Sequence, residues 1–105
     1  MQIKVSKTFA KFINQTAREN GLKFEANYIE MGERFYNYYV GACWGSWHDY
    51  NAETGKYKVI QIVYPYDDHA ATVQLSSARL WNLCDRYGVK TADDLKNMLI
   101  DVLSI

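Results

Sequence analysis

The stretch YNAETGKYKVIQIVYP, residues 50–65, decides the fold class of this chain. It begins with a turn signal, because Gly55 can adopt the positive φ that a tight hairpin needs. After the turn, side chains alternate between two sets that are both largely apolar. One set is Tyr57, Val59, Gln61 and Val63, and the other is Lys58, Ile60, Ile62 and Tyr64. This period of two predicts a strand, and we expect Pro65, the single proline, to end it.

An amphipathic helix is predicted ahead of this hairpin, over residues 6–21. Ser6 is a good N-cap, and Gly21 can adopt the left-handed conformation that ends many helices. The apolar face of the helix recurs at helical spacing and consists of Phe9, Phe12, Ile13 and Ala17. The period then changes to two over residues 22–29, which predicts a strand. Its buried face consists of Leu22, Phe24, Ala26 and Tyr28.

Aromatic residues are concentrated in RFYNYYVGACWGSWHDY, residues 34–50, which holds seven of the sixteen in the chain. We predict a strand over residues 34–44, after a turn around Gly32, with a bend at Gly45 beyond it. Both faces of this strand are apolar. The face assigned to the core, against the first helix, holds Phe35, Tyr39 and Cys43, with Asn37 paired to a helix end. The opposite face holds Tyr36, Tyr38, Val40 and Trp44.

The last third of the chain predicts two helices. Residues 66–76 are compatible with a short strand at 72–75 or with an irregular lead-in. A helix then begins after Ser76 or Ser77 and runs through Tyr87, where Gly88 stops it. Thr91 and Asp94 have the spacing of a capping box and start the second helix. The whole chain, 1–105, is therefore expected to form one α+β domain with an N-terminal helix, a three- to four-stranded antiparallel sheet and two C-terminal helices.

Charge and composition exclude several classes of protein. Twelve basic residues balance twelve acidic ones, so no overall attraction to nucleic acid or anionic membrane is expected. No apolar run approaches the length of a membrane span, and the N-terminus MQIKVSKTF lacks the apolar core of a secretory signal. Cys43 and Cys84 form no recognisable motif. We expect a cytoplasmic protein with free thiols and without a cofactor.

No catalytic or metal site is predicted. The DDH triplet at 67–69 offers ligand types, yet neighbouring residues in an extended chain point in different directions. We interpret Asp67 and Asp68 as a turn. A Cys43–His48 pair would need an oxyanion site, for which the sequence gives no sign. Phosphate-binding glycine loops and nucleophile-elbow serines are also lacking, so an enzyme is not expected.

Nucleic-acid binding remains an alternative function. The order helix, three strands, helix is that of the double-stranded RNA-binding domain, but the second helix opens with LSSARLWN and carries a single arginine there. A better footprint for phosphates is the basic face of the first helix, formed by Lys7, Lys11 and Arg18.

The surplus of apolar surface on the predicted sheet has two explanations. The last helices cover the second face, or that face is exposed and binds a partner. For the second case we assign the partner surface to aromatic residues of the 34–50 segment, which are Tyr36, Tyr38, Trp44, Trp47 and Tyr50. Alanine at Trp44 or Trp47 should then leave the fold intact, whereas Phe35→Ala should not.

Residues 25–55 are locally acidic, with five acidic side chains against one basic one. Four of these carboxylates, Glu30, Glu33, Asp49 and Glu53, are added to the predicted partner surface. Residues 1–24 are the reverse, with five basic side chains against one acidic one. The folded surface could therefore have one basic and one acidic face.

The opening IKVSKTFAKFIN, the hairpin at 50–65 and the length resemble small proteins of phages and mobile elements of gut Firmicutes, a group that includes anti-CRISPR proteins. The resemblance implies a non-enzymatic, stoichiometric inhibitor that binds a host protein or protein–nucleic acid complex. Such inhibitors sometimes present acidic groups where nucleic acid would lie. The alternative is a small nucleic-acid-binding or regulatory protein, and a homodimer is open in either case.

Overall fold

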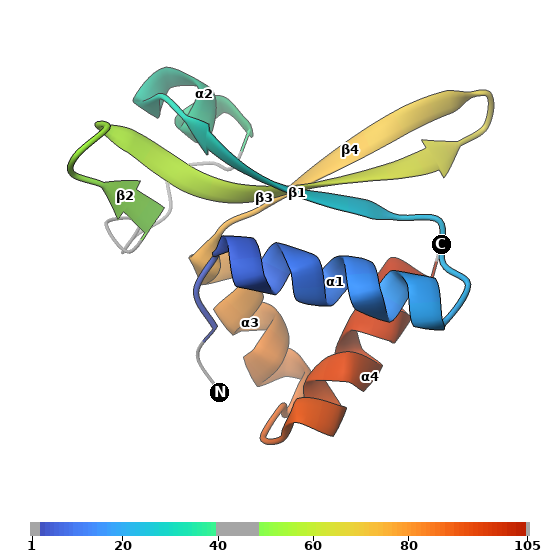
Figure 1. The fold of residues 1–105 in the computed structure, drawn as a ribbon. Coiled ribbons are helices and arrows are strands. Elements are labelled where there is room, and N and C mark those ends of the chain that lie inside the picture. The colour runs from blue at the N-terminus through green and yellow to red at the C-terminus, as the bar shows by residue number, and fades with distance from the viewer. Residues whose placement is uncertain (1–2, 40–48, 105) are drawn as a thin grey trace.

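The chain forms a four-stranded antiparallel sheet with three helices on one face and a short helix on the other (Figure 1). The computed structural model describes residues 3–39 and 49–104. In chain order the elements are α1 (Lys7–Glu19), β1 (Glu25–Met31), α2 (Glu33–Tyr39), β2 (Tyr50–Asn51), β3 (Lys56–Tyr66), β4 (His69–Leu75), α3 (Ser77–Tyr87) and α4 (Ala92–Leu103). The predicted α+β order is confirmed, with α2 as an addition.

Helix α1 begins and ends as the sequence predicts. The Ser6 hydroxyl accepts from the amide of Phe9 at 3.1 Å, and Gly21 has a φ of +66°. The helix also covers the edge of the sheet. The Asn14 side chain donates to the carbonyl of Ala26 in β1 at 2.8 Å and accepts from its amide at 2.7 Å. Those backbone groups would otherwise face outward from an edge strand.

Strand β3 is the centre of the sheet. It pairs with β1 on one side and with β2 and β4 on the other. The hairpin between β2 and β3 has Gly55 at a φ of +68°, as predicted. Because side chains alternate along β3, Ile60 and Ile62 enter the main core, whereas Val59 enters a second cluster on the opposite face.

The prediction that Pro65 ends this strand is wrong, because β3 continues to Tyr66. The register pairs Pro65 with Ala70, and β1 reaches only as far as Val63. Tyr66 and His69 flank a two-residue turn and exchange the ladder hydrogen bonds, so the Pro65 nitrogen points away from β4. It faces the side where β1 has not yet begun, and therefore proline costs the sheet no hydrogen bond.

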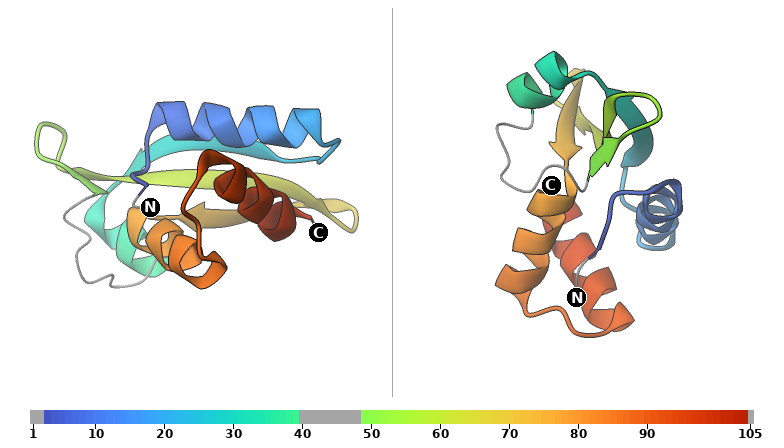
Figure 2. Two further views of the ribbon diagram at one scale, coloured as in Figure 1. Left: turned by 90° about the horizontal axis from the view of Figure 1, so that it is seen from below. Right: turned by 90° about the vertical axis from the view of Figure 1, so that its left-hand side faces the viewer.

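The main core lies between the sheet and helices α1, α3 and α4, which all lie on one face (Figure 2). Its most deeply buried side chains, with at most 2% exposure, include Ile13, Ile60, Leu80, Met98 and Leu99. Cys84 also lies in this core as a free thiol, and burial raises its pKa. We interpret Cys84 as a packing residue.

The C-terminal helices follow the predicted start and stop signals. The Ser76 hydroxyl accepts from the amide of Arg79 at 3.3 Å, and Gly88 closes α3 at a φ of +62°. Thr91 and Asp94 form the predicted capping box of α4. The amides of residues 90 and 91 donate to the Asp94 carboxylate and lower its pKa.

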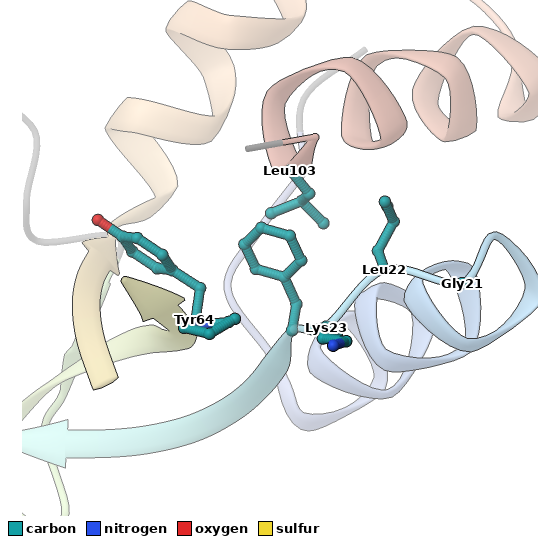
Figure 3. A pocket seen from close by; sticks show the side chains of 7 residues that line it. Gly21, Leu22, Lys23, Tyr64 and Leu103 are labelled. Carbon is teal, nitrogen blue, oxygen red and sulfur yellow. The ribbon is translucent and has the colours of Figure 1, made fainter. Parts of the chain in front are cut away.

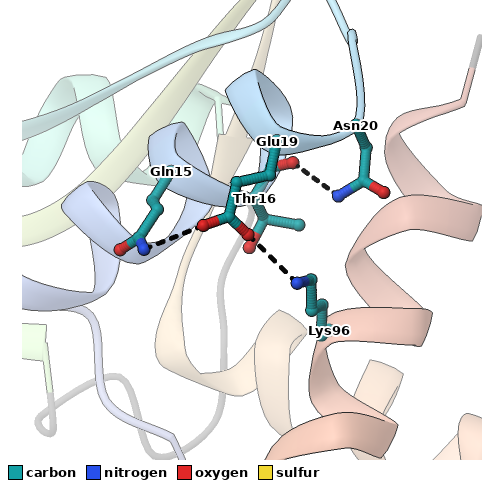
Figure 4. Close-up of polar contacts among 5 residues, drawn as sticks. All are labelled: Gln15, Thr16, Glu19, Asn20 and Lys96. Carbon is teal, nitrogen blue, oxygen red and sulfur yellow. Dashed lines mark hydrogen bonds and ion pairs between the residues drawn. The ribbon is translucent and has the colours of Figure 1, made fainter.

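Polar contacts join α1 to α4 at the surface (Figure 4). Glu19 accepts from Gln15 and from Lys96, each at 3.0 Å, and both contacts lower the pKa of Glu19. The Asn20 side chain donates to the carbonyl of Thr16 at 2.8 Å. Since the ion pair is well exposed, it contributes little to stability, and the packing of the two helices depends on their apolar residues.

The predicted strand at 34–44 is wrong in its described part, because residues 33–39 form α2. The amide of Tyr36 donates to the carbonyl of Gly32 at 2.9 Å, which opens the helix, and Glu33 lies favourably in its first turn. The aromatic residues here follow one another almost without interruption. They show neither the spacing of two that indicates a strand nor the spacing of three to four that indicates a helix, so the local pattern does not distinguish the two. Residues 40–44 lie outside the described part of the chain.

Candidate functional site

Helix α2 packs against the outer face of the sheet through one ring. Tyr36 is 1% exposed and stacks on Tyr57 of β3, with ring centroids 4.3 Å apart and an interplanar angle of 21°. Val59 lies beside them, fully buried, and Ile29 and Met31 complete the cluster. The prediction of Tyr36 as a partner-binding residue is therefore wrong, since its ring anchors the helix to the sheet.

Asp49 is buried beneath the same end of the sheet, at 1% exposure. Its carboxylate accepts from the Tyr36 hydroxyl at 3.1 Å and from the amide of Ser77 at 3.1 and 3.3 Å. Ser77 is the first residue of α3, where a negative charge is favourable. The Ser77 hydroxyl in turn accepts from the amide of Val5 at 3.0 Å.

This network explains why the prediction of Asp49 on the partner surface is wrong. The carboxylate joins α2 to the start of α3, and the Ser77 hydroxyl extends the network to the segment ahead of α1, so three parts that are distant in sequence are linked. Because its oxygens are enclosed among protein donors, Asp49 is not accessible to a partner. Its structural role is to hold α2 in position through the Tyr36 hydroxyl.

The outward side of α2 carries exposed rings. Tyr38 is 80% exposed and Phe35 is 59% exposed, and these positions, three apart, lie on the same side of the helix. Tyr50 of β2 is 45% exposed, and its ring lies 5.3 Å from that of Tyr57. The prediction of Phe35 as a core residue is wrong, because the helix turns neighbouring side chains in different directions. We define the aromatic surface as Phe35, Tyr38 and Tyr50.

Carboxylates border the aromatic surface. Glu33 is exposed at the start of α2, and Glu53 is exposed in the turn between β2 and β3. Glu30 does not border this surface, so the prediction of Glu30 on the partner surface is wrong: it alternates with Ile29 and Met31 of the second cluster and therefore lies on the opposite face of β1. There it is partly buried and accepts from the Asn51 amide at 3.1 Å and from the Tyr28 hydroxyl at 3.2 Å. The hydrogen bond from Asn51 lowers the pKa of Glu30, which keeps it negatively charged at neutral pH.

Several predicted site residues are not placed. Trp44 and Trp47 lie outside the described residues, as do Cys43 and the side chains of Asn37 and Tyr39. The expected stability of alanine variants at the two tryptophans stays a prediction. Phe35 was missed as a surface residue. The one local feature that favours a helix start is the acidic Glu33 after Gly32, and by itself it does not outweigh the strand propensity of the aromatic run.

The basic stripe of α1 lies along the flank that borders β1. Lys7, Lys11 and Arg18 are all exposed. The Lys7 ammonium lies 5.9 Å from the centre of the Tyr28 ring, a cation–π arrangement. Between these cations, Asn14 faces the sheet edge, so the stripe is a narrow row of charges.

A small hollow opens at the far end of the sheet, between the end of α1, the start of β1 and the end of α4 (Figure 3). It measures about 250 Å³ and is lined mainly by apolar side chains, with Leu22 and Leu103 on two sides of it. Phe24 and Tyr64 pack at 5.9 Å across its base. The hollow is smaller than typical small-molecule sites, which measure about 300–1,000 Å³. Its one ionisable lining residue other than Tyr64 is Lys23.

Comparisons with known proteins add no assignment: no family model, no curated protein and no solved structure matches this chain. Within residues 3–39 and 49–104, every helix is too short or too polar to cross a membrane. Over the same two ranges, no group of three His, Cys, Asp or Glu side chains is arranged to hold a metal ion. Asp67 and Asp68 form a tight turn there. His48 and Cys43, the candidate pair considered above, lie outside the described part of the chain.

Proposed function

We propose that this protein is a protein-binding module that contacts its partner through the aromatic surface. The observation that carries the proposal is the exposure of Tyr38 and Phe35 on a helix whose neighbouring ring, Tyr36, is held in a stacked and hydrogen-bonded position. Rigid exposed aromatic rings supply a large contact area at low cost in conformational entropy. Isolated exposed apolar residues are common, but adjacent ones on a single helix face are typical of interaction sites.

The chemistry of the surface indicates the kind of partner. Aromatic side chains at the centre require an apolar groove, and the carboxylates of Glu33 and Glu53 favour basic residues around it. A protein surface that binds nucleic acid has such a basic rim. This character and the resemblance to phage-encoded inhibitors support an inhibitor of a host protein or protein–nucleic acid complex, acting by occupation and without catalysis.

We expect Tyr38→Ala to weaken partner binding by about 30-fold or more, which corresponds to a hot-spot loss of about 2 kcal/mol. The measurement is capture from a host lysate by immobilised protein, followed by titration with the purified captured protein. The matched control is Tyr87→Ala. Tyr87 is also an exposed tyrosine, at 42% against 80% for Tyr38, but it lies on α3 on the opposite side of the sheet and donates to Asp101 at 2.6 Å.

The control distinguishes specific binding through the aromatic surface from non-specific binding through any exposed tyrosine. If Tyr38→Ala and Tyr87→Ala reduce the titrated affinity equally, or if neither does, the aromatic surface is not the contact site and the proposal fails.

The second candidate function is nucleic-acid binding by the exposed cations of α1. We expect no mobility shift of DNA or RNA at submicromolar protein in about 150 mM salt, because three phosphate contacts give only a modest and salt-sensitive affinity. A shift that disappears in the Lys7→Glu/Lys11→Glu variant would contradict this expectation. It would make the basic stripe the functional site.

A further inference from the structure

The β1 edge and the β4 edge of the sheet differ in how far other parts of the chain cover their backbone groups. At the β1 edge, the Asn14 side chain satisfies both backbone groups of Ala26, and α1 runs alongside. At the other edge, β4 pairs with β3 alone among the described residues (Figure 1). An uncovered edge presents a row of backbone donors and acceptors to any strand that approaches.

The outward groups of β4 can be identified from the register. Tyr66 and His69 close a two-residue turn as a hydrogen-bonded pair, so every second residue after His69 faces β3. The backbone groups of Ala70, Thr72 and Gln74 therefore point outward. One observed contact agrees with this, because the Arg79 guanidinium donates to the carbonyl of Gln74 at 3.2 Å.

The sequence of β4 does not protect this edge. Residues 70–74 read AATVQ, without a charge or a proline. Val73 is 39% exposed although it lies on the face that carries the core. Natural edge strands usually contain lysine, proline or a bulge that prevents pairing with another chain. Here a seven-residue strand lacks the first two of these devices.

We infer that β4 pairs with β4 of a second copy of this chain, antiparallel and about a two-fold axis at Thr72. In this register Thr72 lies opposite its own counterpart, and all seven residues of the strand find a partner. Ala71 lies opposite Val73 of the second copy, which covers the exposed valine. No like charges oppose each other along the strand pair.

Charge complementarity favours a second copy as the occupant of this edge. The antiparallel arrangement carries the turn of Asp67 and Asp68 beyond the end of the strand pair, toward Arg79 of the second copy. Arg79 lies on the wall of a hollow of about 280 Å³, which Arg86 also lines. In the dimer, the amide of Ala70 from the second copy donates to the Gln74 carbonyl. The Arg79 guanidinium is then available to pair with the carboxylates of Asp67 and Asp68 from that copy.

The assembly closes at two copies. The contact is of the isologous type, with the same strand used by both copies about the two-fold axis, so the β4 edges of the two chains satisfy each other. The dimer is independent of the proposed function and would present two aromatic surfaces.

The test is sedimentation equilibrium of the full chain over a range of concentrations. We expect a dimer of twice the 12.2 kDa chain mass, with a dissociation constant of roughly 1–100 µM because the interface is small. Thr72→Lys should raise this constant at least tenfold or so, because the two lysines lie directly opposite each other. Thr72 is exposed, so the variant should keep its melting temperature. The control, Ala52→Lys, adds the same charge in the exposed turn before β3 and should not change the constant.

A charge exchange tests the register. Asp68→Arg and Arg79→Asp should each weaken the dimer, and the double variant should recover it, because the two positions lie at opposite ends of β4 within one chain and meet only between copies. A chain that stays monomeric overturns the inference, as does a dimer that Thr72→Lys leaves unchanged. A third outcome also overturns it: the chain is monomeric, and Thr72→Lys weakens its binding to another protein. The edge of β4 would then pair with a strand of that protein and not with a second copy.

Discussion

Tyr36→Ala is expected to lower the free energy of unfolding by about 3–5 kcal/mol, whereas Phe35→Ala, one residue earlier, should change it by about 0.5 kcal/mol or less. The Tyr36 ring is enclosed between α2 and the sheet and stacks on Tyr57, and Phe35 is 59% exposed. A large buried ring leaves a cavity when it is truncated, and an exposed ring does not. Urea denaturation of both variants measures the difference.

This pair of variants is a matched comparison, because the residues are adjacent, aromatic and in the same helix. A small domain has a total stability of about 5–15 kcal/mol, so the loss at Tyr36 is a large fraction of it. If Phe35→Ala is the more destabilising change, the segment adopts the strand in which Phe35 faces the core, and the aromatic surface defined above does not exist.

Asp49→Ala is expected to lower the free energy of unfolding by about 2–4 kcal/mol, because two buried donors lose their acceptor. The amide of Ser77 loses its bonds at 3.1 and 3.3 Å, and the Tyr36 hydroxyl loses its bond at 3.1 Å. Replacement of an exposed carboxylate, as in Glu53→Ala, should have little effect. Chemical denaturation of the two variants makes the comparison.

A double-mutant cycle with Tyr36→Phe assigns part of this loss to the Tyr36–Asp49 bond, because Tyr36→Phe removes the hydroxyl and keeps the stacked ring. The two effects should be non-additive by about 0.5–3 kcal/mol. Full additivity would contradict the hydrogen bond, and Asp49→Ala with the stability of Glu53→Ala would show that the carboxylate is at the surface.

These two residues also connect stability to the proposed function. Tyr36 and Asp49 do not belong to the aromatic surface, yet they fix the helix that presents it. Variants at either position should therefore weaken partner binding in proportion to the loss of α2 structure. Tyr38→Ala should weaken binding while stability is retained, which distinguishes a contact residue from a supporting one.

Much of the fold could be predicted because its signals are local. Hydroxyl caps at Ser6, Ser76 and Thr91 satisfy amides within their own first helical turn, and that chemistry depends only on neighbours in sequence. Gly55 and Gly88 have positive φ at the turn and the helix end where their neighbours require it. The alternation of apolar residues in β1 and β3 likewise gives the pairing faces without knowledge of the partner strand.

Other features depend on neighbours that are distant in sequence. Pro65 is tolerated within β3 because β1 stops at Val63, and no local pattern shows where another strand ends. Asp49 is buried because it meets the start of α3, which lies 28 residues further along the chain.

The sequence by itself determined the α+β class, the first helix and the two C-terminal helices with their caps, and the faces of β1 and β3, because each depends on contacts within a few residues. Only the tertiary structure decided that residues 33–39 form a helix, which ring of that helix is buried, and which edge of the sheet is covered. An aromatic run satisfies helix and strand equally well in isolation. The choice therefore depends on the single position, Tyr36, whose ring can stack on Tyr57 and whose hydroxyl can reach Asp49.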